Sequence, residues 1–170
     1  MLSLNLAFGY MLSFDLGALG PTHPWLNAVG AFQSRVLSRY AAEKMAGYTE
    51  LAGNVTRSDF EHTTVTMNWD QGNAYVMGGY VLPPEGALVQ KNDGSLIAGI
   101  FTAYNGVPLS TDDHYLIEER GANEIVVRQP MGANTSLKLT RLPGWNNTTR
   151  LSAWAYRRDG HLIGALSVTV

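Results

Sequence analysis

The sequence predicts a mainly β protein, an antiparallel β-sandwich preceded by an N-terminal helical segment. From about residue 54 to residue 170, short apolar stretches alternate with turn sequences rich in Gly, Asn, Asp and Pro. Ahead of them, one stretch carries apolar residues at helical spacing. Short strands at regular spacing, separated by such turns, are typical of sandwiches and barrels.

The first element is apolar at every even position from Leu2 to Leu16. A period of two favours an extended strand or a hairpin over a helix. The run Leu6–Leu12 is apolar at almost every residue, so a buried helix is the alternative. Either element needs an apolar surface to pack on, and this abrupt apolar start predicts a truncated chain.

A helix follows. Thr22 and Pro24 supply an N-cap and a first-turn proline, and Gly47 is placed to end the helix. The apolar stripe of this helix consists of Trp25, Val29, Phe32, Val36, Tyr40 and Met45. A helix of about 22 residues is roughly 33 Å long, which a small β module covers only in part. An exposed stripe would support a partner docked on it, either a catalytic barrel domain of the same protein or another subunit, and a covered stripe would weaken that interpretation.

These elements predict two parts, residues 1–52 with the apolar segment and the helix, and residues 53–170 with the sandwich. Tyr48–Val55 is the expected passage between them, and Gly78-Gly79, inside one strand, is interpreted as a bulge. The expected strands are Thr63–Trp69, Tyr75–Leu82, Ala87–Gln90, Leu96–Tyr104, Tyr115–Glu119, Glu124–Gln129, Ser136–Leu142, Leu151–Tyr156 and His161–Val170.

Composition excludes several classes of function. A net charge of −2 argues against non-specific nucleic-acid binding, which needs a basic face. No apolar run reaches the roughly 18 residues of a membrane span, so we expect no membrane partner. The chain has no cysteine, which excludes disulfides and thiolate metal sites. The N-terminus lacks the basic region of a signal peptide, and a bacterial cytoplasmic and a secreted location both stay open.

Charge is unevenly distributed along the chain. From Glu50 to Glu124 there are eleven acidic residues against three basic ones, and from Arg128 to Val170 six basic residues against Asp159 alone. The simpler interpretation is that the two sets lie on neighbouring strands and neutralise each other. The alternative is a basic binding surface.

No residue is predicted to be catalytic or to bind a metal or cofactor. The densest titratable set is Asp112-Asp113-His114 with Glu118 and Glu119. Adjacent residues of a strand point to opposite faces, so Asp112 and Asp113 cannot act as a pair, and the segment is better explained as a polar turn. The histidines show no metal-ligand spacing, and Asn92-Asp93-Gly94 alone supplies too few oxygens for calcium.

Aromatic residues are the better functional candidates, because flat rings stack on sugars while their polar edges bind hydroxyl groups. The candidate carbohydrate-binding residues are Trp69, Tyr75, Tyr104 and Trp145. The alternative for each is an ordinary core or edge aromatic. Trp154 and Tyr156 share one strand face and are expected in the core.

Several segments of the sequence carry a family resemblance. They are Leu6-Ala-Phe-Gly-Tyr-Met-Leu-Ser-Phe-Asp-Leu16, Phe32-Gln-Ser-Arg-Val-Leu-Ser-Arg-Tyr40, Thr64-Val-Thr-Met-Asn-Trp69, Gly79-Tyr-Val-Leu-Pro-Pro-Glu-Gly-Ala-Leu-Val89 and His114-Tyr-Leu-Ile-Glu-Glu119. Together they resemble the C-terminal part of a bacterial glycoside hydrolase of the α-galactosidase-like or endo-α-N-acetylgalactosaminidase-like kind.

In such enzymes a catalytic barrel precedes a β-sandwich. The resemblance implies that residues 1 to about 50 are the last barrel elements and that the rest is an accessory sandwich, which supports the barrel and contacts glycan. The family's catalytic carboxylates lie upstream of this segment, so the chain alone is expected to be inactive. Two alternatives stay open: a self-contained, lectin-like carbohydrate-binding module, and an assembly protein that forms a symmetric oligomer through its apolar N-terminus.

Overall fold

The chain is mainly β with antiparallel sheets. The structure, a computed structural model, describes residues 2–10, 24–110, 114–132 and 136–169, and it divides into two compact units, Met1–Thr140 and Arg141–Val170. The elements are α1 (Leu2–Phe8), α3 (Pro24–Arg35), the 3-10 helix η1 (Leu37–Arg39), β1 (Met45–Ala52), β2 (Val55–Phe60), β3 (Thr63–Asn68), β4 (Tyr75–Met77), β5 (Tyr80–Leu82), β6 (Ala87–Lys91), β7 (Leu96–Phe101), β8 (Ala103–Tyr104), β9 (Val107–Pro108), β10 (His114–Arg120), β11 (Ile125–Met131), β12 (Ala153–Tyr156) and β13 (Leu162–Leu166).

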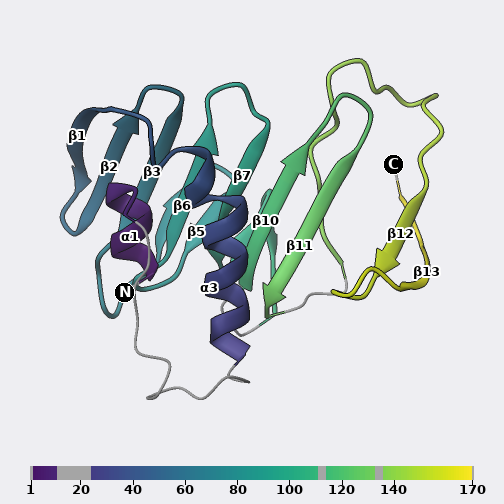
Figure 1. Cartoon of the computed structure of the whole chain (residues 1–170), viewed down its shortest axis with the longest axis horizontal. Coiled ribbons are helices and arrows are strands. Elements are labelled where there is room, and N and C mark those ends of the chain that lie inside the picture. The colour runs from purple at the N-terminus through teal and green to yellow at the C-terminus, as the bar shows by residue number, and fades with distance from the viewer. Residues whose placement is uncertain (1, 11–23, 111–113, 133–135, 170) are drawn as a thin grey trace. The chain divides into compact units, whose positions relative to one another are not determined.

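A seven-stranded sheet organises the first unit, with strand order β1-β2-β3-β6-β7-β10-β11 and antiparallel pairing throughout (Figure 1). Two short hairpins leave this sheet: β4–β5 between β3 and β6, and β8–β9 between β7 and β10. The two hairpins pair with each other through Val81 and Ala103 and form a four-stranded sheet. Every connection between neighbouring strands is therefore either a turn or a short hairpin.

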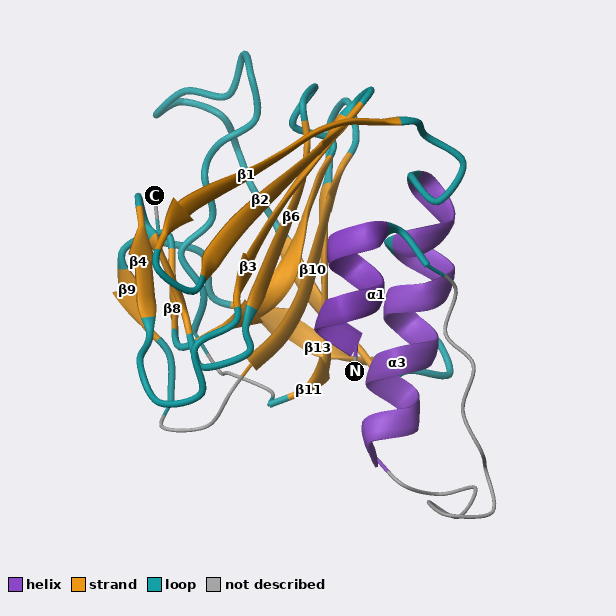
Figure 2. Cartoon of the chain, turned by 90° about the vertical axis from the view of Figure 1, so that its left-hand side faces the viewer, coloured by secondary structure: helices purple, strands orange, loops and turns teal. Residues whose placement is uncertain are grey.

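Both faces of the large sheet are covered (Figure 2). Helices α1 and α3 lie on one face, and the small sheet containing β4, β8 and β9 lies on the other. A central strand is therefore buried on both sides, and in β7 all six residues are buried. At Gly99 of this strand an added Cβ would lie 2.1 Å from the carbonyl oxygen of Ala87 and 2.6 Å from the ring of Phe101, so no larger residue fits.

The helical face holds the larger core, in which residues of α1 and α3 pack against β2, β3, β6, β7 and β10. Of the stripe predicted for the helix, Val29, Phe32, Val36 and Tyr40 are buried, and Trp25 is partly buried against the same core. The stripe is covered by residues of this chain. Because the stripe is covered, it gives no support for a barrel domain or another subunit docked on the helix.

The opposite face holds a smaller core beneath the small sheet. The rings of Tyr80, Phe101 and Tyr104 pack with centroids 5.2–5.6 Å apart. Leu82, Leu88, Ile97 and Leu116 complete this core. Aromatic pairs at this spacing contribute stability beyond that of burying their rings. The small sheet is therefore held mainly by aromatic residues.

Two predictions for the N-terminal region were wrong. Residues 2–8 form helix α1 instead of an extended strand, and this helix buries Leu2, Ser3, Leu6 and Ala7, which share a helical face, while Leu4 is exposed. The second helix ends at Arg35 instead of near Gly47. Tertiary contacts override the helical pattern, because the hydroxyl of Tyr40 donates to the carbonyl of Leu6 at 2.6 Å and its ring packs on Phe60.

The strands were predicted better, with three corrections. β1 and β2 were missed, and the boundary expected near residue 52 falls between these two paired strands. Gly78-Gly79 is the turn of the β4–β5 hairpin, with Met77 opposite Tyr80, instead of a bulge. Residues 136–142 form no strand.

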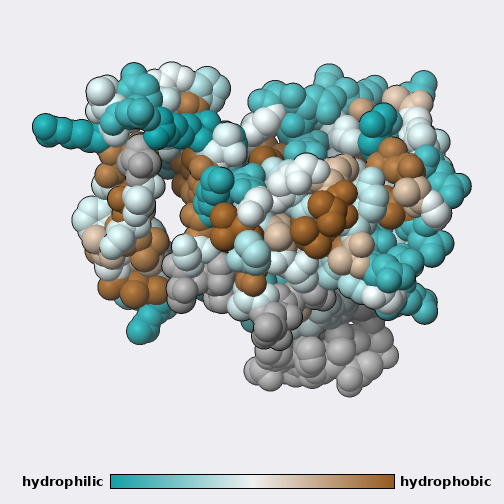
Figure 3. Space-filling view, turned by 180° about the vertical axis from the view of Figure 1, so that it is seen from behind, coloured by the Kyte–Doolittle hydropathy of each residue, from teal (hydrophilic) through white to brown (hydrophobic). Residues whose placement is uncertain are grey.

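The second unit contains the two-stranded antiparallel sheet β12–β13. Trp154 and Tyr156 were expected in a core, but both are exposed, as are Leu162, Ile163 and Leu166. Figure 3 shows apolar side chains, coloured brown, on the surface of this unit. Two strands cannot enclose a core by themselves, which explains why the expected burial does not occur.

A cluster around Glu43 fastens the connection after η1 to the sheet. Its carboxylate accepts hydrogen bonds from Lys91 Nζ at 2.7 Å, from the His62 backbone at 2.9 Å and from the Thr63 hydroxyl at 3.1 Å. Burial raises the pKa of Glu43, but these hydrogen bonds outweigh burial and hold its pKa below the ordinary value. The carboxylate is thus stabilised in its charged form in the folded state.

We expect Glu43→Gln to lower the free energy of unfolding at neutral pH by about 1.5–3 kcal/mol, the range for hydrogen bonds to a charged group. A lowered pKa in the folded state contributes stability above the unfolded-state pKa, and this contribution is lost as the pH falls through the folded-state value. The difference between variant and wild type in urea unfolding should therefore shrink in acid. Glu61→Gln, at an exposed carboxylate, is the control, and an equal loss in both variants would contradict the assignment.

Candidate functional site

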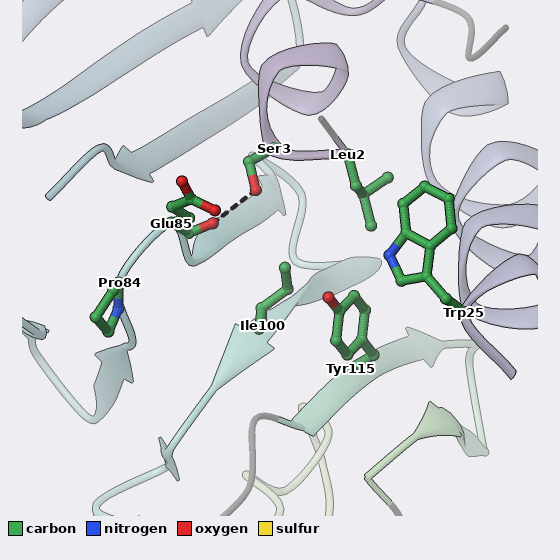
Figure 4. A pocket seen from close by; sticks show the side chains of 7 residues that line it. All are labelled: Leu2, Ser3, Trp25, Pro84, Glu85, Ile100 and Tyr115. Carbon is green, nitrogen blue, oxygen red and sulfur yellow. Dashed lines mark hydrogen bonds between the residues drawn. The ribbon is translucent and has the colours of Figure 1, made fainter. Parts of the chain in front are cut away.

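A pocket of about 160 Å³ opens on the helical side of the first unit. Its lining comes from α1, α3, β7, β10 and the turn between β5 and β6, and consists of Leu2, Ser3, Trp25, Pro84, Glu85, Ile100 and Tyr115 (Figure 4). The pocket thus brings two aromatic rings, a hydroxyl group and a carboxylate together with the side chains of Leu2, Pro84 and Ile100. Five separate segments of the chain must fold together to form it.

The two aromatic side chains approach the pocket from different elements. Figure 4 shows the nitrogen edge of the Trp25 indole and the hydroxyl of the Tyr115 ring turned toward the space between Leu2 and Ile100. Both rings are partly buried against the helical core. Tyr115 also meets Phe32 edge to face, with centroids 6.1 Å apart. The contacts of both rings with the helical core therefore set their orientation at the pocket.

The carboxylate is presented by the turn Pro83–Gly86. Glu85 has a positive φ of 58°, an uncommon backbone conformation for a residue with a side chain. Its carbonyl accepts a hydrogen bond from the Ser3 hydroxyl at 2.6 Å, and its N–H donates to the carbonyl of Asp70 at 3.1 Å. At Gly86 an added Cβ would lie 2.7–2.9 Å from atoms of Pro83. The turn is thus held by hydrogen bonds and close packing, and the exposed Glu85 side chain lies at the pocket.

Asn68 holds this turn from inside the protein. Its buried side-chain amide donates to the carbonyls of Pro83 at 2.9 Å, Asn73 at 2.8 Å and Leu82 at 3.3 Å, and its backbone N–H donates to the carbonyl of Gly86. The phrase Asn-Trp followed by Pro-Pro-Glu-Gly in the sequence is thus one hydrogen-bonded unit. It connects the end of β3 to the carboxylate at the pocket.

Of the four aromatic residues proposed from the sequence, three belong to the first unit and Trp145 to the second. Trp69 packs partly against the helical core, and its indole N–H donates to the Thr56 hydroxyl at 2.7 Å. Tyr75 packs against the smaller core, and Tyr104 is fully buried within it. Trp145 belongs to the second unit, where it is partly buried. Tyr104 therefore has no ring face for a ligand, and Trp69 has a structural hydrogen bond.

Glu118 and Glu119 point to opposite faces of β10. Glu118 is fully buried beneath the small sheet, where it accepts hydrogen bonds from the Tyr104 hydroxyl at 2.6 Å and from Arg120. Burial and then the charge of Glu118 raise the pKa of Tyr104 well above its ordinary value. Glu119 pairs with Arg39 and Arg128 on the helical side. These carboxylates are engaged in ion pairs and cannot act as a catalytic pair.

His114 is buried, and its Nε2 lies 2.6 Å from the Ser110 hydroxyl. Serine activation requires a base that is oriented by a third group. The buried Nδ1 of His114 has no hydrogen-bond partner among the described residues, so that group is not found there. Asp112 and Asp113 lie outside the described residues.

Neither a metal centre nor a membrane span is found where the chain is described. Its His, Asp and Glu side chains form no group of three that could hold a metal ion. Its helices include none long and apolar enough to cross a membrane.

Sequence reasoning missed the pocket. Trp25 was assigned to a helix stripe, Tyr115 to a strand and Glu85 to a turn, and each assignment is compatible with the structure. The available signal was the phrase Pro83-Pro84-Glu85-Gly86, in which a carboxylate is held between two prolines and a glycine. The sequence could not show that Trp25 and Glu85 meet at one pocket, because Glu85 lies 60 positions after Trp25 in the chain.

No family model, curated protein or solved structure matches this chain.

Because of the hydrogen bonds of Asn68, we expect Asn68→Asp to destabilise the fold strongly. The substitution keeps the shape but replaces the amide donor with an acceptor that faces three carbonyl oxygens. We expect the free energy of unfolding to fall by about 3 kcal/mol, since a buried unsatisfied polar group costs about 1–3 kcal/mol. Asn92→Asp, at an exposed position, is the matched control in urea unfolding. Equal stability of the two variants would show that Asn68 does not hold the turn.

Proposed function

We propose that this chain is a non-catalytic carbohydrate-binding β module, acting as an accessory part of a carbohydrate-active enzyme, and that the pocket between Trp25, Glu85 and Tyr115 binds one sugar residue. The observation that supports this proposal is the combination of two fixed aromatic rings and a carboxylate around a small pocket. The lectin-like module that the sequence left as an alternative uses the same chemistry.

The chemistry of the pocket suits a polyol. The apolar faces of a sugar ring pack on aromatic rings, and its hydroxyl groups bind polar edges. Trp25 and Tyr115 place aromatic rings at the pocket, and the Glu85 carboxylate is a hydrogen-bond acceptor. The walls formed by Leu2 and Ile100 are apolar. Small ligands are generally held by apolar walls and a few well-placed polar groups.

The size of the pocket limits the ligand. Pockets for drug-sized molecules start at about 300 Å³, whereas this one measures about 160 Å³. A single sugar residue at the end of a glycan is the largest part that we expect it to enclose. Because little surface would be buried, affinity for a monosaccharide should be weak, on the order of 1 mM or about −4 kcal/mol.

The pocket also argues against hydrolysis. Glycoside hydrolases generally place two carboxyl groups on either side of the scissile bond. Among the residues that line this pocket, Glu85 is the only carboxylate. Binding without cleavage is therefore the function that these side chains support, in agreement with the accessory role that the family resemblance implies.

The proposal is tested by titrating ¹⁵N-labelled protein with methyl α- and β-glycosides of galactose, glucose and N-acetylgalactosamine. We expect at least one glycoside to shift the indole N–H signal of Trp25 with a dissociation constant on the order of 1 mM. Glu85→Gln, which keeps the size of an exposed side chain, should weaken this binding severalfold by removing the charged acceptor.

Trp154→Phe, at an exposed tryptophan of the second unit, should leave binding unchanged. Two results would contradict the proposal: no response of the Trp25 signal to any of the glycosides well above millimolar concentration, or equal binding by wild type and the Glu85 variant.

A further inference from the structure

The hairpin β12–β13 presents two strand edges that no other strand pairs with in the described chain. Isolated two-stranded hairpins are marginally stable in water. Trp154, Tyr156, Leu162 and Ile163 of this hairpin are 53–65% exposed. An edge strand with exposed apolar side chains is a site where another strand can add.

The two edges of the hairpin differ. In β13 the residues opposite Ala155 and Tyr156 are Gly164 and Leu162, so Ile163 is an extra residue that interrupts the pairing. β12 has no such insertion, and its four residues, Ala153–Tyr156, form a regular edge. Because a bulge disrupts further pairing, β12 is the edge better suited to receive a strand.

The charge of the second unit limits what can bind there. Residues 141–170 carry four arginines against Asp159 alone, and Arg157 and Arg158 directly follow β12. Residues 1–140 carry thirteen acidic residues against eight basic ones. The first unit of another copy of this chain therefore has the opposite net charge.

One strand of the first unit has a regular stretch as long as β12 and side chains of complementary character. β1 is an edge of the seven-stranded sheet and pairs only with β2. Its register is regular over the four residues Gly47–Glu50, between two irregularities. Tyr48 and Leu51 are exposed apolar side chains, and Glu50 is an exposed carboxylate. Apolar groups flanked by an acid thus face solvent, complementary to the apolar and basic β12.

The other long sheet edge fits poorly. β11 contains Pro130, which has no N–H to donate to an added strand. It also carries Arg128, which has the same charge as the arginines that follow β12. The edges of the four-stranded sheet, β4 and β9, are only three and two residues long.

We propose that the chain forms a dimer in which β12 of each copy adds to the edge of β1 in the other copy. Main-chain hydrogen bonds extend each seven-stranded sheet at its β1 edge by the β12–β13 hairpin of the other copy, as in other cases of strand addition. β12 runs parallel to β1 in this pairing, which places Arg157 and Arg158 of the other copy beside Glu50, whereas an antiparallel pairing would place them beside Lys44. Because the exchange is reciprocal, the two interfaces close the assembly at two copies.

The test uses the full chain and two charge-reversed variants, Glu50→Lys and the double variant Arg157→Glu/Arg158→Glu. Sedimentation equilibrium should find a reversible dimer of the wild type, with a dissociation constant that rises with salt because charges contribute. Each variant alone should dissociate at least about tenfold more readily, since like charges then meet at both interfaces. An equimolar mixture of the two variants should restore dimers, because both interfaces again pair opposite charges.

All the substituted residues are exposed, and circular dichroism should confirm that each variant is folded. Glu124→Lys, an acidic residue at the far side of the sheet between β10 and β11, is the charge-matched control and should dimerise as the wild type does. A monomeric wild type at the highest attainable concentration would overturn the proposal. So would variants that dimerise unchanged, or a mixture of the two variants that stays monomeric.

Discussion

The need to cover both faces of the seven-stranded sheet determines the arrangement of the first unit. Central strands such as β7 are apolar on both sides, and an apolar face left in water would lose roughly 25 cal/mol for every Å² that is not buried. Helices α1 and α3 bury one face, and the sheet formed by the two inserted hairpins buries the other. The resulting fold has three layers, with a sandwich of two sheets on one side and helices on the other.

The pocket follows from this layering. It lies where the helical layer meets the turn that brings the chain back from the small sheet into β6. Asn68 and Ser3 hold that turn through its carbonyl groups, so the position of Glu85 depends on both layers. The aromatic rings are fixed by the same helical core. A binding site placed on packed elements in this way loses little freedom when a ligand enters.

The sequence predicted the β class and most strands, because alternation and turn residues are local signals. For the N-terminus it favoured a strand over the alternative of a buried helix, since Leu2, Leu4 and Leu6 satisfy a period of two, whereas the helix that forms buries Leu2, Ser3, Leu6 and Ala7. It could not separate the helix of Val29 and Phe32 from the bend at Tyr40, which is set by contacts with Leu6 and Phe60 far away in the chain. The candidate aromatics were selected by residue type, whereas burial, as for Tyr104, decides whether a ring can meet a ligand.

Native-state hydrogen exchange would show directly whether α3 rests on the sheet of this same chain. We expect the amides of α3 and of β7 to exchange slowly and through the same cooperative opening, since both enclose one core. Exchange of the α3 amides that is faster by orders of magnitude, while β7 stays protected, would show that α3 does not rest on this sheet. The apolar stripe of the helix would then have to be assigned to a different partner.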